Sequence, residues 1–478
     1  MKYSLFDDKY RTKQQPAVFV FPSNHKDCYQ SKLDSTIETM LRFLLAALAY
    51  TTFLSGVLSF VVVDNPSSIG SDGTMKVRLS PNDLVDGLTK IPDPFLYPTV
   101  FAACFRIGAF IAVIGQPRLP KDDERSRLCP VGSKVIRLPE FGSRARVFYP
   151  ITEKDAKTIS TNSDSRSNGK YCTDGRATSD GMAGLVGFKQ LGLSFLLAHL
   201  AEAPSGCYDM DDIPTAANGN ISTLPFCQVG APLLVYSHGY GGNMDMATYF
   251  LRAIAQRGIV VAALEHTDGT ASSTVLSDGR RLDFDSSLCS LKEGLDKRAR
   301  ELEEAVLYIP SLLPGGSKSP VFLGGHSYGA PSVLLASQRQ RSWDNGPQIL
   351  GLILHDPALS MGRGFNLTPK IPTVSYVSDE YNRAGIACGD ATYHVEGAFH
   401  GNFVDAPLWA PLWVMRTLSL VIPACGPADP EIVHAELAES ARKFCFGLMR
   451  ETDSAKEESG PIATTVAVGG YDLFERVA

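Results

Sequence analysis

The sequence predicts a mixed α/β fold in which helices flank a mostly parallel central sheet. From residue 232 onwards, short apolar segments of strand length alternate with longer segments that have helical periodicity. Strands that alternate with helices form parallel sheets, because each helix carries the chain back to the edge where the next strand starts. A second observation supports this prediction: the sequence G-x-S-x-G at 325–329 directly follows an apolar run. That pattern is typical of the sharp strand-to-helix turn of α/β-hydrolase folds, where a serine occupies the apex.

Each expected element is short and is bounded by glycine, proline or polar residues. The expected strands are 233–237, 259–264, 321–323, 350–354 and 373–377, and the expected helices are 249–257, 291–309, 330–338 and 430–449. Asp429 is placed to cap the last helix, with Pro430 at its first position. Upstream, 135–138 and 144–149 are expected to pair as short edge strands. Functional loops are expected at the carboxyl ends of the parallel strands.

The composition is that of a globular protein, and it limits the possible functions. The chain has 478 residues, of which 44% are hydrophobic and 20% charged, with a formal net charge of −6. This acidic balance argues against a nucleic-acid partner, whose phosphates require a basic surface. Ten cysteines are scattered along the chain without a C-x-x-C pair, so a zinc site is not expected. No metal or other cofactor is expected for this chain. Cys129, Cys172, Cys207 and Cys227 lie in one region, where disulfides and buried thiols are both compatible with the sequence.

The N-terminal part predicts an association with a membrane. Residues 1–36 are expected to form a polar tail, 37–117 a membrane-associated region, 118–450 the catalytic domain and 451–478 a C-terminal tail. Within the second region, 40–63 is apolar apart from Arg42. At about 1.5 Å per residue, this segment is long enough to cross a hydrocarbon core of about 30 Å as a transmembrane helix.

A second apolar segment, 95–115, has Arg106 near its centre. It either spans the membrane or lies on the membrane surface or on the catalytic domain. The side of the membrane that the catalytic domain occupies depends on this choice, and the sequence leaves it open.

Two stretches before the first parallel strand differ in character. Residues 153–181 are rich in Ser, Thr, Asp, Asn and Gly and are expected to form a long flexible insertion. Residues 185–200 are apolar and of helical length, with Lys189 and His199 as the ionisable residues. This stretch is interpreted either as an interfacial helix near the mouth of the active site or as a core helix.

A serine nucleophile needs a general base and a carboxylate that orients the base. On this fold they occur in the order serine, acid, histidine. Ser327 is the nucleophile of the G-x-S-x-G turn. Asp356 closely follows an expected strand and is the preferred acid, while His400 lies in a glycine-flanked loop that can bring its imidazole to the strand ends. The alternatives lie in the following strands and loops: Asp379 and Glu380 for the acid, and His394 for the base.

An acyl-transfer site also needs N–H donors for the oxyanion. One donor comes from the residue after the nucleophile, here Tyr328. The other comes from the loop after an earlier strand, and the glycine-rich sequence HGYGG at 238–242 is that loop. The N–H of Tyr240 is the candidate donor.

These residues together resemble the platelet-activating factor acetylhydrolases of the plasma and type II intracellular group, also called lipoprotein-associated phospholipase A2. The resemblance extends over about 115–450 and is carried by five stretches: PLLVYSHGYG at 232–241, GIVVAALEHTDGTAS at 258–272, GHSYG at 325–329, LGLILHDP at 350–357 and GAFHGNFVD at 397–405. The E-H-x-D and H-x-N-F-x-D patterns are the specific part, because G-x-S-x-G occurs in many hydrolases.

The resemblance implies a calcium-independent α/β-hydrolase that acts at lipid surfaces and cleaves the sn-2 acetyl, short or oxidised acyl chain of phospholipids. It places Asp356 and His400 at the triad positions of the family. It also implies that helices upstream of the oxyanion loop dock on a membrane or lipoprotein. The chain differs from the family in the segment 40–63 and in loop insertions at about 155–180 and 205–228.

The sequence therefore predicts a membrane-anchored serine esterase that hydrolyses the sn-2 ester of a phospholipid without a metal. The phospholipid and the membrane surface are the expected partners. One alternative is another hydrolase on the same fold, such as an A1-type phospholipase, a lysophospholipase or a general short-chain esterase. The other is a non-catalytic lipid-binding protein, against which an intact Ser327, Asp356 and His400 in the required order argue.

Overall fold

The computed structural model describes residues 128–162, 169–185, 189, 194–211, 224, 227–288, 292–314, 316, 319–340, 346–362, 364–419, 424–457 and 474–477. All of these residues lie in Val100–Ala478, the second of the two units into which the chain divides. The membrane segments predicted at 40–63 and 95–115 lie outside the described residues. Within the described ranges, no helix combines the length and the apolar character needed to cross a bilayer.

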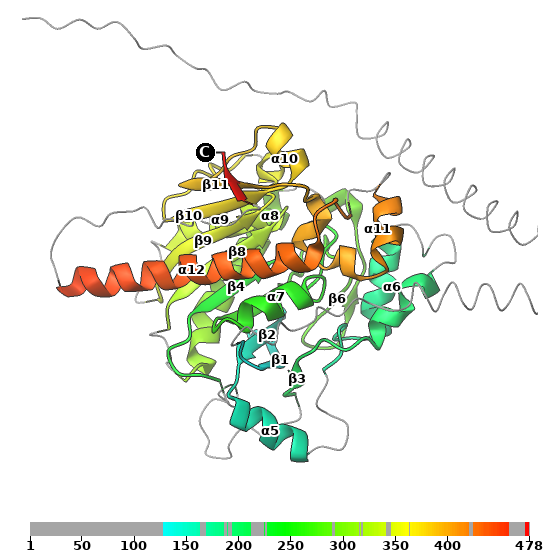
Figure 1. Cartoon of the computed structure of the whole chain (residues 1–478), viewed down its shortest axis with the longest axis horizontal. Coiled ribbons are helices and arrows are strands. Elements are labelled where there is room, and N and C mark those ends of the chain that lie inside the picture. The colour runs from blue at the N-terminus through cyan, green and yellow to red at the C-terminus, as the bar shows by residue number, and fades with distance from the viewer. Residues whose placement is uncertain are drawn as a thin grey trace, which may run out of the picture. The chain divides into compact units, whose positions relative to one another are not determined.

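A 10-stranded sheet forms the centre of the described part of the chain (Figure 1). Its strand order is β12-β11-β10-β9-β8-β4-β5-β2-β1-β3. The strands from β11 to β5 in that order run parallel, whereas β2 is antiparallel to β5 and β1, and β12 is antiparallel to β11. The strands span Val131–Arg137 (β1), Arg144–Pro150 (β2), Tyr208–Asp209 (β3), Leu233–Ser237 (β4), Val260–Glu265 (β5), Val321–His326 (β8), Ile349–His355 (β9), Thr373–Val377 (β10), Ala391–Val395 (β11) and Phe474–Arg476 (β12). A separate ribbon pairs β6 (Thr274–Val275) with β7 (Arg281–Leu282).

Helices cover both faces of the sheet, with α7 and α12 on one face and α8 and α9 on the other (Figure 1). The α-helices span Glu153–Asn162 (α5), Arg176–Leu185 (α6), Thr248–Ala255 (α7), Lys292–Tyr308 (α8), Gly329–Arg339 (α9), Asp379–Arg383 (α10), Leu412–Leu418 (α11) and Pro430–Glu457 (α12). Short 3-10 helices span Ser194–Ala201 (η2), Ser286–Leu288 (η3), Ile309–Leu312 (η4), Leu359–Gly362 (η7), His400–Phe403 (η8) and Ala406–Leu408 (η9).

The central strands are buried on both faces, which explains their nearly continuous apolar sequences. Successive side chains of a strand point to opposite faces. In β8, Phe322 therefore belongs to the core that contains α7 and α12, whereas Val321 and Leu323 belong to the core that contains α8 and α9. Because the central strands run parallel, their carboxyl ends meet at one edge of the sheet.

The expected mixed α/β fold with a mostly parallel sheet is confirmed. The strands predicted at 233–237 and 373–377 match β4 and β10 at both ends. The side chain of Asp429 accepts the N–H of Glu431 at 2.9 Å, as expected for a residue that caps α12.

One strand prediction needs correction. Strands β1 and β2 pair with each other as expected, but β2 is not an edge strand, because it lies between β1 and β5. Arg144 and Arg146 give β2 the sequence of a partly exposed strand. Both side chains are buried, and both form ion pairs. Each guanidinium can be buried because a carboxylate neutralises its charge.

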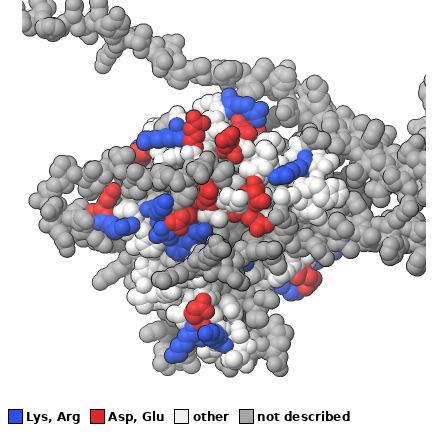
Figure 2. Space-filling model, viewed as in Figure 1, with Lys and Arg blue, Asp and Glu red and all other residues white. Residues whose placement is uncertain are grey.

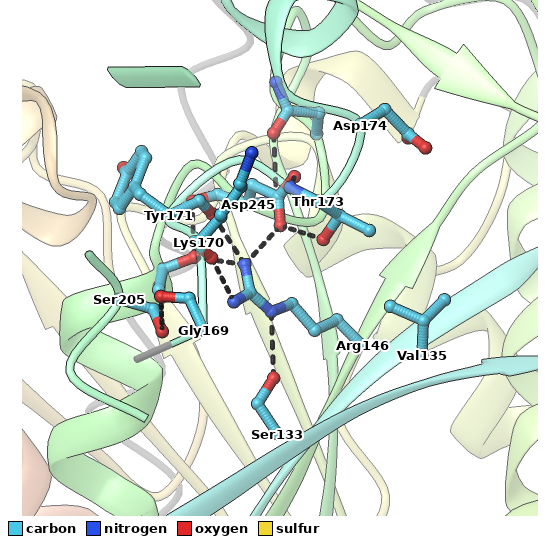
Figure 3. Close-up of polar contacts among 12 residues, drawn as sticks. Ser133, Val135, Arg146, Gly169, Lys170, Tyr171, Thr173, Asp174, Ser205 and Asp245 are labelled. Atoms are coloured by element: carbon cyan, nitrogen blue, oxygen red, sulfur yellow. Dashed lines mark hydrogen bonds and ion pairs between the residues drawn. The ribbon is translucent and has the colours of Figure 1, made fainter. Parts of the chain in front are cut away.

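The guanidinium of Arg146 joins several parts of the chain (Figure 3). It forms an ion pair with Asp245 at 2.7 Å and donates to the carbonyls of Lys170 and Tyr171, each at 2.6 Å. Its Nε donates to Ser133 Oγ at 3.1 Å. These bonds hold β2 to β1, to the segment that contains Lys170 and to the turn before α7.

The expectation of a long flexible insertion at 153–181 is wrong where the structure describes it. This stretch contains α5 and the start of α6. Thr152 Oγ1 accepts the N–H of Asp155 at 3.1 Å and so caps α5. The polar residues that suggested a loop therefore supply the start of a helix.

Two further expectations change in detail. In the apolar stretch 185–200, the structure describes the end of α6 and the 3-10 helix η2 rather than one helix, with Leu197 and Leu200 buried. The prediction of a C-terminal tail at 451–478 is wrong in part. Helix α12 continues to Glu457, and β12 extends the sheet beside β11, where the ring of Phe474 packs against core tyrosines.

The cysteines and the surface charges add two facts about the described residues. Cys129, Cys172 and Cys227 are free thiols, which answers the open question of disulfides for them. Burial raises the pKa of Cys227 to about 12, so this thiol stays protonated. On the face shown in Figure 2, basic and acidic side chains are interspersed, and no broad area carries one sign.

Candidate active site

Ser327 occupies the turn between β8 and α9 and has a left-handed backbone conformation, with φ of 53°. Its N–H donates to the carbonyl of His355 at 2.9 Å. The flanking glycines are required for steric reasons. A Cβ on Gly325 would lie 2.6 Å from the backbone of Gly329, and a Cβ on Gly329 would lie 2.1 Å from the carbonyl oxygen of Ser237. The G-x-S-x-G sequence thus forms a strand, a strained serine turn and a helix.

Asp356 follows β9, the neighbour of β8, and its backbone is also left-handed, with φ of 44°. Its fully buried carboxylate accepts the N–H of Ser378 at 2.7 Å and a hydrogen bond from Nδ1 of His400 at 2.8 Å. Because a carboxylate only accepts, Nδ1 of His400 carries the proton and Nε2 presents a lone pair. This is the tautomer that a general base requires.

The loop that carries His400 is fastened by two other residues of the H-x-N-F-x-D pattern. Oδ1 of Asn402 accepts two backbone N–H groups, at 2.7 and 3.0 Å. The carboxylate of Asp405 accepts two N–H groups at the start of α7, at 2.8 and 3.1 Å. The pattern therefore ties the loop to its own turn and to a helix on one face of the sheet, which fixes where the imidazole lies.

Two rings hold the imidazole of His400. The ring of His326 lies 4.5 Å away between centroids, and the ring of Tyr381 lies 5.3 Å away with an angle of 5° between the planes. The side chain of His400 is 28% exposed, whereas that of Asp356 is 0% exposed. Solvent or a substrate can therefore reach the imidazole of His400, whereas the carboxylate of Asp356 is inaccessible.

The loop after β4 lies against the nucleophile. A Cβ on Gly239 would be 2.9 Å from the Cβ of Ser327, so a residue with a side chain does not fit there. In the chain, Tyr240 comes directly after Gly239, and Tyr328 comes directly after Ser327. The N–H of Gly241 donates to a carbonyl of the segment after β5 at 2.8 Å, which fixes the loop.

The E-H-x-D segment at 265–268 supports that loop through Arg298 of α8. Asp268 and Arg298 form a fully buried ion pair at 2.7 Å. Arg298 also donates to the carbonyl of His238 at 2.7 Å, and its guanidinium lies 4.7 Å from the ring centroid of Tyr328. A single guanidinium therefore contacts both sides of the expected oxyanion site.

Sequence reasoning missed Arg298. The amphipathic pattern of 291–309 made it one charge among many in a polar helix. The available signal was its position three residues from Leu295 and four from Leu302, which places a charge on the apolar face of α8.

Burial keeps His266 and His326 neutral. It lowers the pKa of His266 and of His326 well below the ordinary value. Burial raises the pKa of Glu301, which accepts a hydrogen bond from Nδ1 of His266 at 2.7 Å, to about 7. Asp268 behaves differently: although burial acts to raise its pKa, the charge of Arg298 lowers it to about 2.

The structure brings Asp356 and His400 into direct contact and places Ser327 at the end of the neighbouring strand. Among the described residues, no hydrogen bond joins Ser327 to His400; in such sites this contact often tightens only when substrate binds. The alternatives pair with each other, since Nε2 of His394 lies 2.8 Å from Asp379. In the part of the chain that the structure describes, no group of three His, Cys, Asp or Glu residues could hold a metal ion.

The fold and this arrangement are those of a serine hydrolase. Residues 179–309 match the family model described as Platelet-activating factor acetylhydrolase, isoform II. The match confirms the family resemblance over that range and supports a carboxylic ester hydrolase of the serine type. It includes β4, the loop at 238–242, the E-H-x-D segment and α8, and it ends before Ser327.

Two solved esterase structures are also similar to this chain. One is a ferulic acid esterase from Streptomyces cinnamoneus, with 19% sequence identity and a TM-score of 0.44, where the match covers 69% of this chain and 92% of that chain. The other is the esterase Est22, with 12% identity and a TM-score of 0.34, where the match covers 72% of this chain and 88% of that chain.

Proposed function

We propose that the protein is a calcium-independent serine esterase that hydrolyses the sn-2 acetyl, short or oxidised acyl ester of phospholipids. The observation that carries the proposal is the 2.8 Å hydrogen bond between Asp356 and His400, next to a serine on a strained strand-to-helix turn. The family match over 179–309 supports an acetyl or similarly short acyl group.

In the acylation step, Ser327 Oγ attacks the acyl carbonyl carbon while Nε2 of His400 takes the hydroxyl proton. Asp356 holds the imidazole in the required tautomer and stabilises its charged form. The N–H groups of Tyr240 and Tyr328 are the proposed donors to the oxyanion. The bond to the glycerol oxygen then breaks, and His400 returns the proton to that leaving oxygen.

Deacylation repeats these steps with water as the nucleophile. His400 takes a proton from the water, the hydroxide attacks the acyl-enzyme, and Ser327 leaves with the proton that His400 returns. The free fatty acid and the lysophospholipid are the products. In both steps of the reaction, His400 carries out the proton transfers.

Exposed aromatic side chains support a lipid surface as the place of action. Phe195 in η2 is 41% exposed, and Trp413 in α11 is 59% exposed. Nε2 of His199 in η2 lies 2.8 Å from the carbonyl of Trp409, which joins η2 to the turn before α11. Aromatic side chains on two connected elements can enter the headgroup region of a bilayer together. The membrane anchor predicted at 40–63 is part of this proposal.

The proposal is tested with phosphatidylcholines whose sn-2 chains range from acetyl to long acyl. Hydrolysis is measured with excess chelator, for the wild-type protein and for Ser327→Ala. The proposal expects activity that resists the chelator, falls steeply with sn-2 chain length and is absent from the variant. Activity that persists on long chains would indicate a general phospholipase instead, and release of the sn-1 acyl group would indicate an A1-type enzyme. Equal activity of the wild type and Ser327→Ala would contradict the catalytic assignment itself.

A further inference from the structure

Tyr381 lies against the proposed triad, although the sequence motifs do not include it. It lies in α10, directly after the strand that follows Asp356 in the sheet. Its ring stacks on the imidazole of His400, 5.3 Å between centroids and 5° from parallel. The Ser327 side chain lies close enough to its phenol to act on the pKa of that group.

The scaffold of the triad also fixes the position of Tyr381. Ser378, whose N–H donates to Asp356 at 2.7 Å, caps α10 by accepting the N–H of Tyr381 with its side chain. Asp379 donates its N–H to the carbonyl of Ala398 at 2.9 Å, and its carboxylate accepts the N–H of Gly397 at 3.0 Å. The start of α10 is therefore bonded both to the acid and to the loop of the base. These bonds fix the position of Tyr381 relative to Asp356 and His400.

The chemistry of the phenol limits what Tyr381 can do. Burial raises the pKa of Tyr381, so the group keeps its proton at all working pH values. A protonated phenol is not a general base, but it can donate a hydrogen bond to an oxygen that gains negative charge. Ser327 Oγ gains such charge when it gives its proton to His400.

We propose that Tyr381 is a further catalytic residue, which donates a hydrogen bond to Ser327 Oγ as that atom loses its proton, while its ring keeps the imidazole of His400 in plane. This role rests on the proposed function. The proton of Ser327 moves to Nε2 of His400, the Oγ–carbon bond forms, and the phenol proton stays on Tyr381. In deacylation the same donor stabilises Ser327 Oγ as the leaving group.

Three variants separate the parts of this proposal. Tyr381→Phe removes the donor and keeps the stacked ring, and Tyr381→Leu removes both. Tyr393→Phe is the matched control, because it removes a phenol from the neighbouring β11, where the ring stacks on another core tyrosine. Pre-steady-state hydrolysis of p-nitrophenyl acetate gives the acylation constant, KM and the deacylation constant, and thermal unfolding gives Tm.

The proposal expects Tyr381→Phe to lower both the acylation and the deacylation constants about tenfold, with KM and Tm unchanged, because one hydrogen bond to the reacting atom is lost. Tyr381→Leu is expected to lower both rate constants about a hundredfold. Tyr393→Phe is expected to have the rate constants of the wild type. If the wild type is active and Tyr381→Phe has the same rate constants, the role of Tyr381 is overturned, and the proposed function is not affected. A folded wild type that forms no acyl-enzyme would overturn the proposed function, and this role with it.

Discussion

At the scale of single residues, the candidate site is marked by backbone strain. Ser327 and Asp356 are the non-glycine residues with positive φ in the described part of the chain, and both directly follow adjacent strands of the sheet. Such conformations cost about 1–3 kcal/mol each and persist only where the surrounding structure enforces them. Here the enforced geometry places Asp356 in contact with the imidazole of His400 and puts Ser327 at the end of the neighbouring strand. The sequence predicted both residues from their places after apolar strands, but it gave no sign of the strain at Asp356.

Asp356→Asn is expected to lower kcat by about 10⁴ with little change in stability. The amide oxygen can still accept the N–H of Ser378, but the amide nitrogen then donates to Nδ1 of His400. The proton of the imidazole moves to Nε2, which can no longer act as a base. Steady-state kinetics and thermal unfolding of the purified variant check this expectation. A variant that retains a tenth of the wild-type kcat would contradict the assignment of Asp356.

Buried His355 predicts a dependence of stability on pH. Burial lowers the pKa of His355 to about 3, whereas an unfolded histidine titrates near pH 6.5. Between these values the unfolded chain binds more protons, so the free energy of unfolding falls as the pH is lowered.

His355→Asn removes this contribution. Its unfolding free energy, from denaturant titrations between pH 6 and 4, is expected to fall less steeply than that of the wild type by about 1 kcal/mol per pH unit. The comparison uses slopes, because loss of ring volume lowers the stability of the variant at every pH. Parallel slopes would contradict the neutral, buried state of His355.

At the scale of elements, α8 does more than cover the sheet. Its amphipathic pattern predicted a helix that packs through Leu295, Leu302 and similar residues, and these side chains are buried. The same helix brings Arg298 to the carbonyl of His238 and to the ring of Tyr328. No spacing rule in the sequence could show this, because the partners come from three separate segments.

Variants of the Arg298–Asp268 pair separate two roles of Arg298: holding the loop that carries Tyr240, and contributing to the stability of the fold. Arg298→Met leaves Asp268 charged, buried and unpaired, which is expected to cost about 3–5 kcal/mol of unfolding free energy. The double variant Arg298→Met with Asp268→Leu is expected to recover most of that loss, because no buried charge remains. Its kcat is expected to stay about 10² below the wild type, since the loop that carries Tyr240 is no longer held.

Arg300→Met is the matched control for this pair of variants. Arg300 lies on the same helix, its side chain is 58% exposed, and it pairs with Asp296. Surface pairs of this kind contribute little, so stability and kcat are expected to match the wild type. A double variant with wild-type kcat would contradict the positioning role of Arg298.

At the scale of the whole molecule, the sequence predicted the parallel strands themselves, but it did not predict the strands that flank them in the sheet. The alternation of apolar strands with helices predicted β4, β5, β8, β9 and β10. The position of β2 inside the sheet depends on Glu265 and Asp245, which pair with Arg144 and Arg146 from 121 and 99 residues further along the chain. The strand β12 comes from Phe474–Arg476, a segment whose sequence resembles an ordinary tail. Long-range pairing of this kind leaves no periodic pattern.

The exposed aromatics predict how the whole molecule meets its substrate. The double variant Phe195→Ser with Trp413→Ser is expected to hydrolyse short-chain phosphatidylcholine in vesicles about tenfold more slowly, because less apolar surface enters the bilayer. Its rate on soluble p-nitrophenyl acetate is expected to equal that of the wild type. Ile432→Ser removes an apolar side chain that is 53% exposed on α12 and serves as the control. Equal loss on vesicles and on the soluble ester would contradict a role in lipid contact.

The most direct test of the central claim is covalent labelling with a fluorophosphonate, followed by intact-mass measurement and peptide mapping. The account predicts one adduct on the wild-type protein, located at Ser327, and no adduct on a folded Ser327→Ala variant. It also predicts that His400→Ala reacts at least about 10³ times more slowly, because the serine has lost its base. An adduct at another residue, or a folded wild-type protein that takes up no probe, would contradict the assignment of Ser327 as the nucleophile.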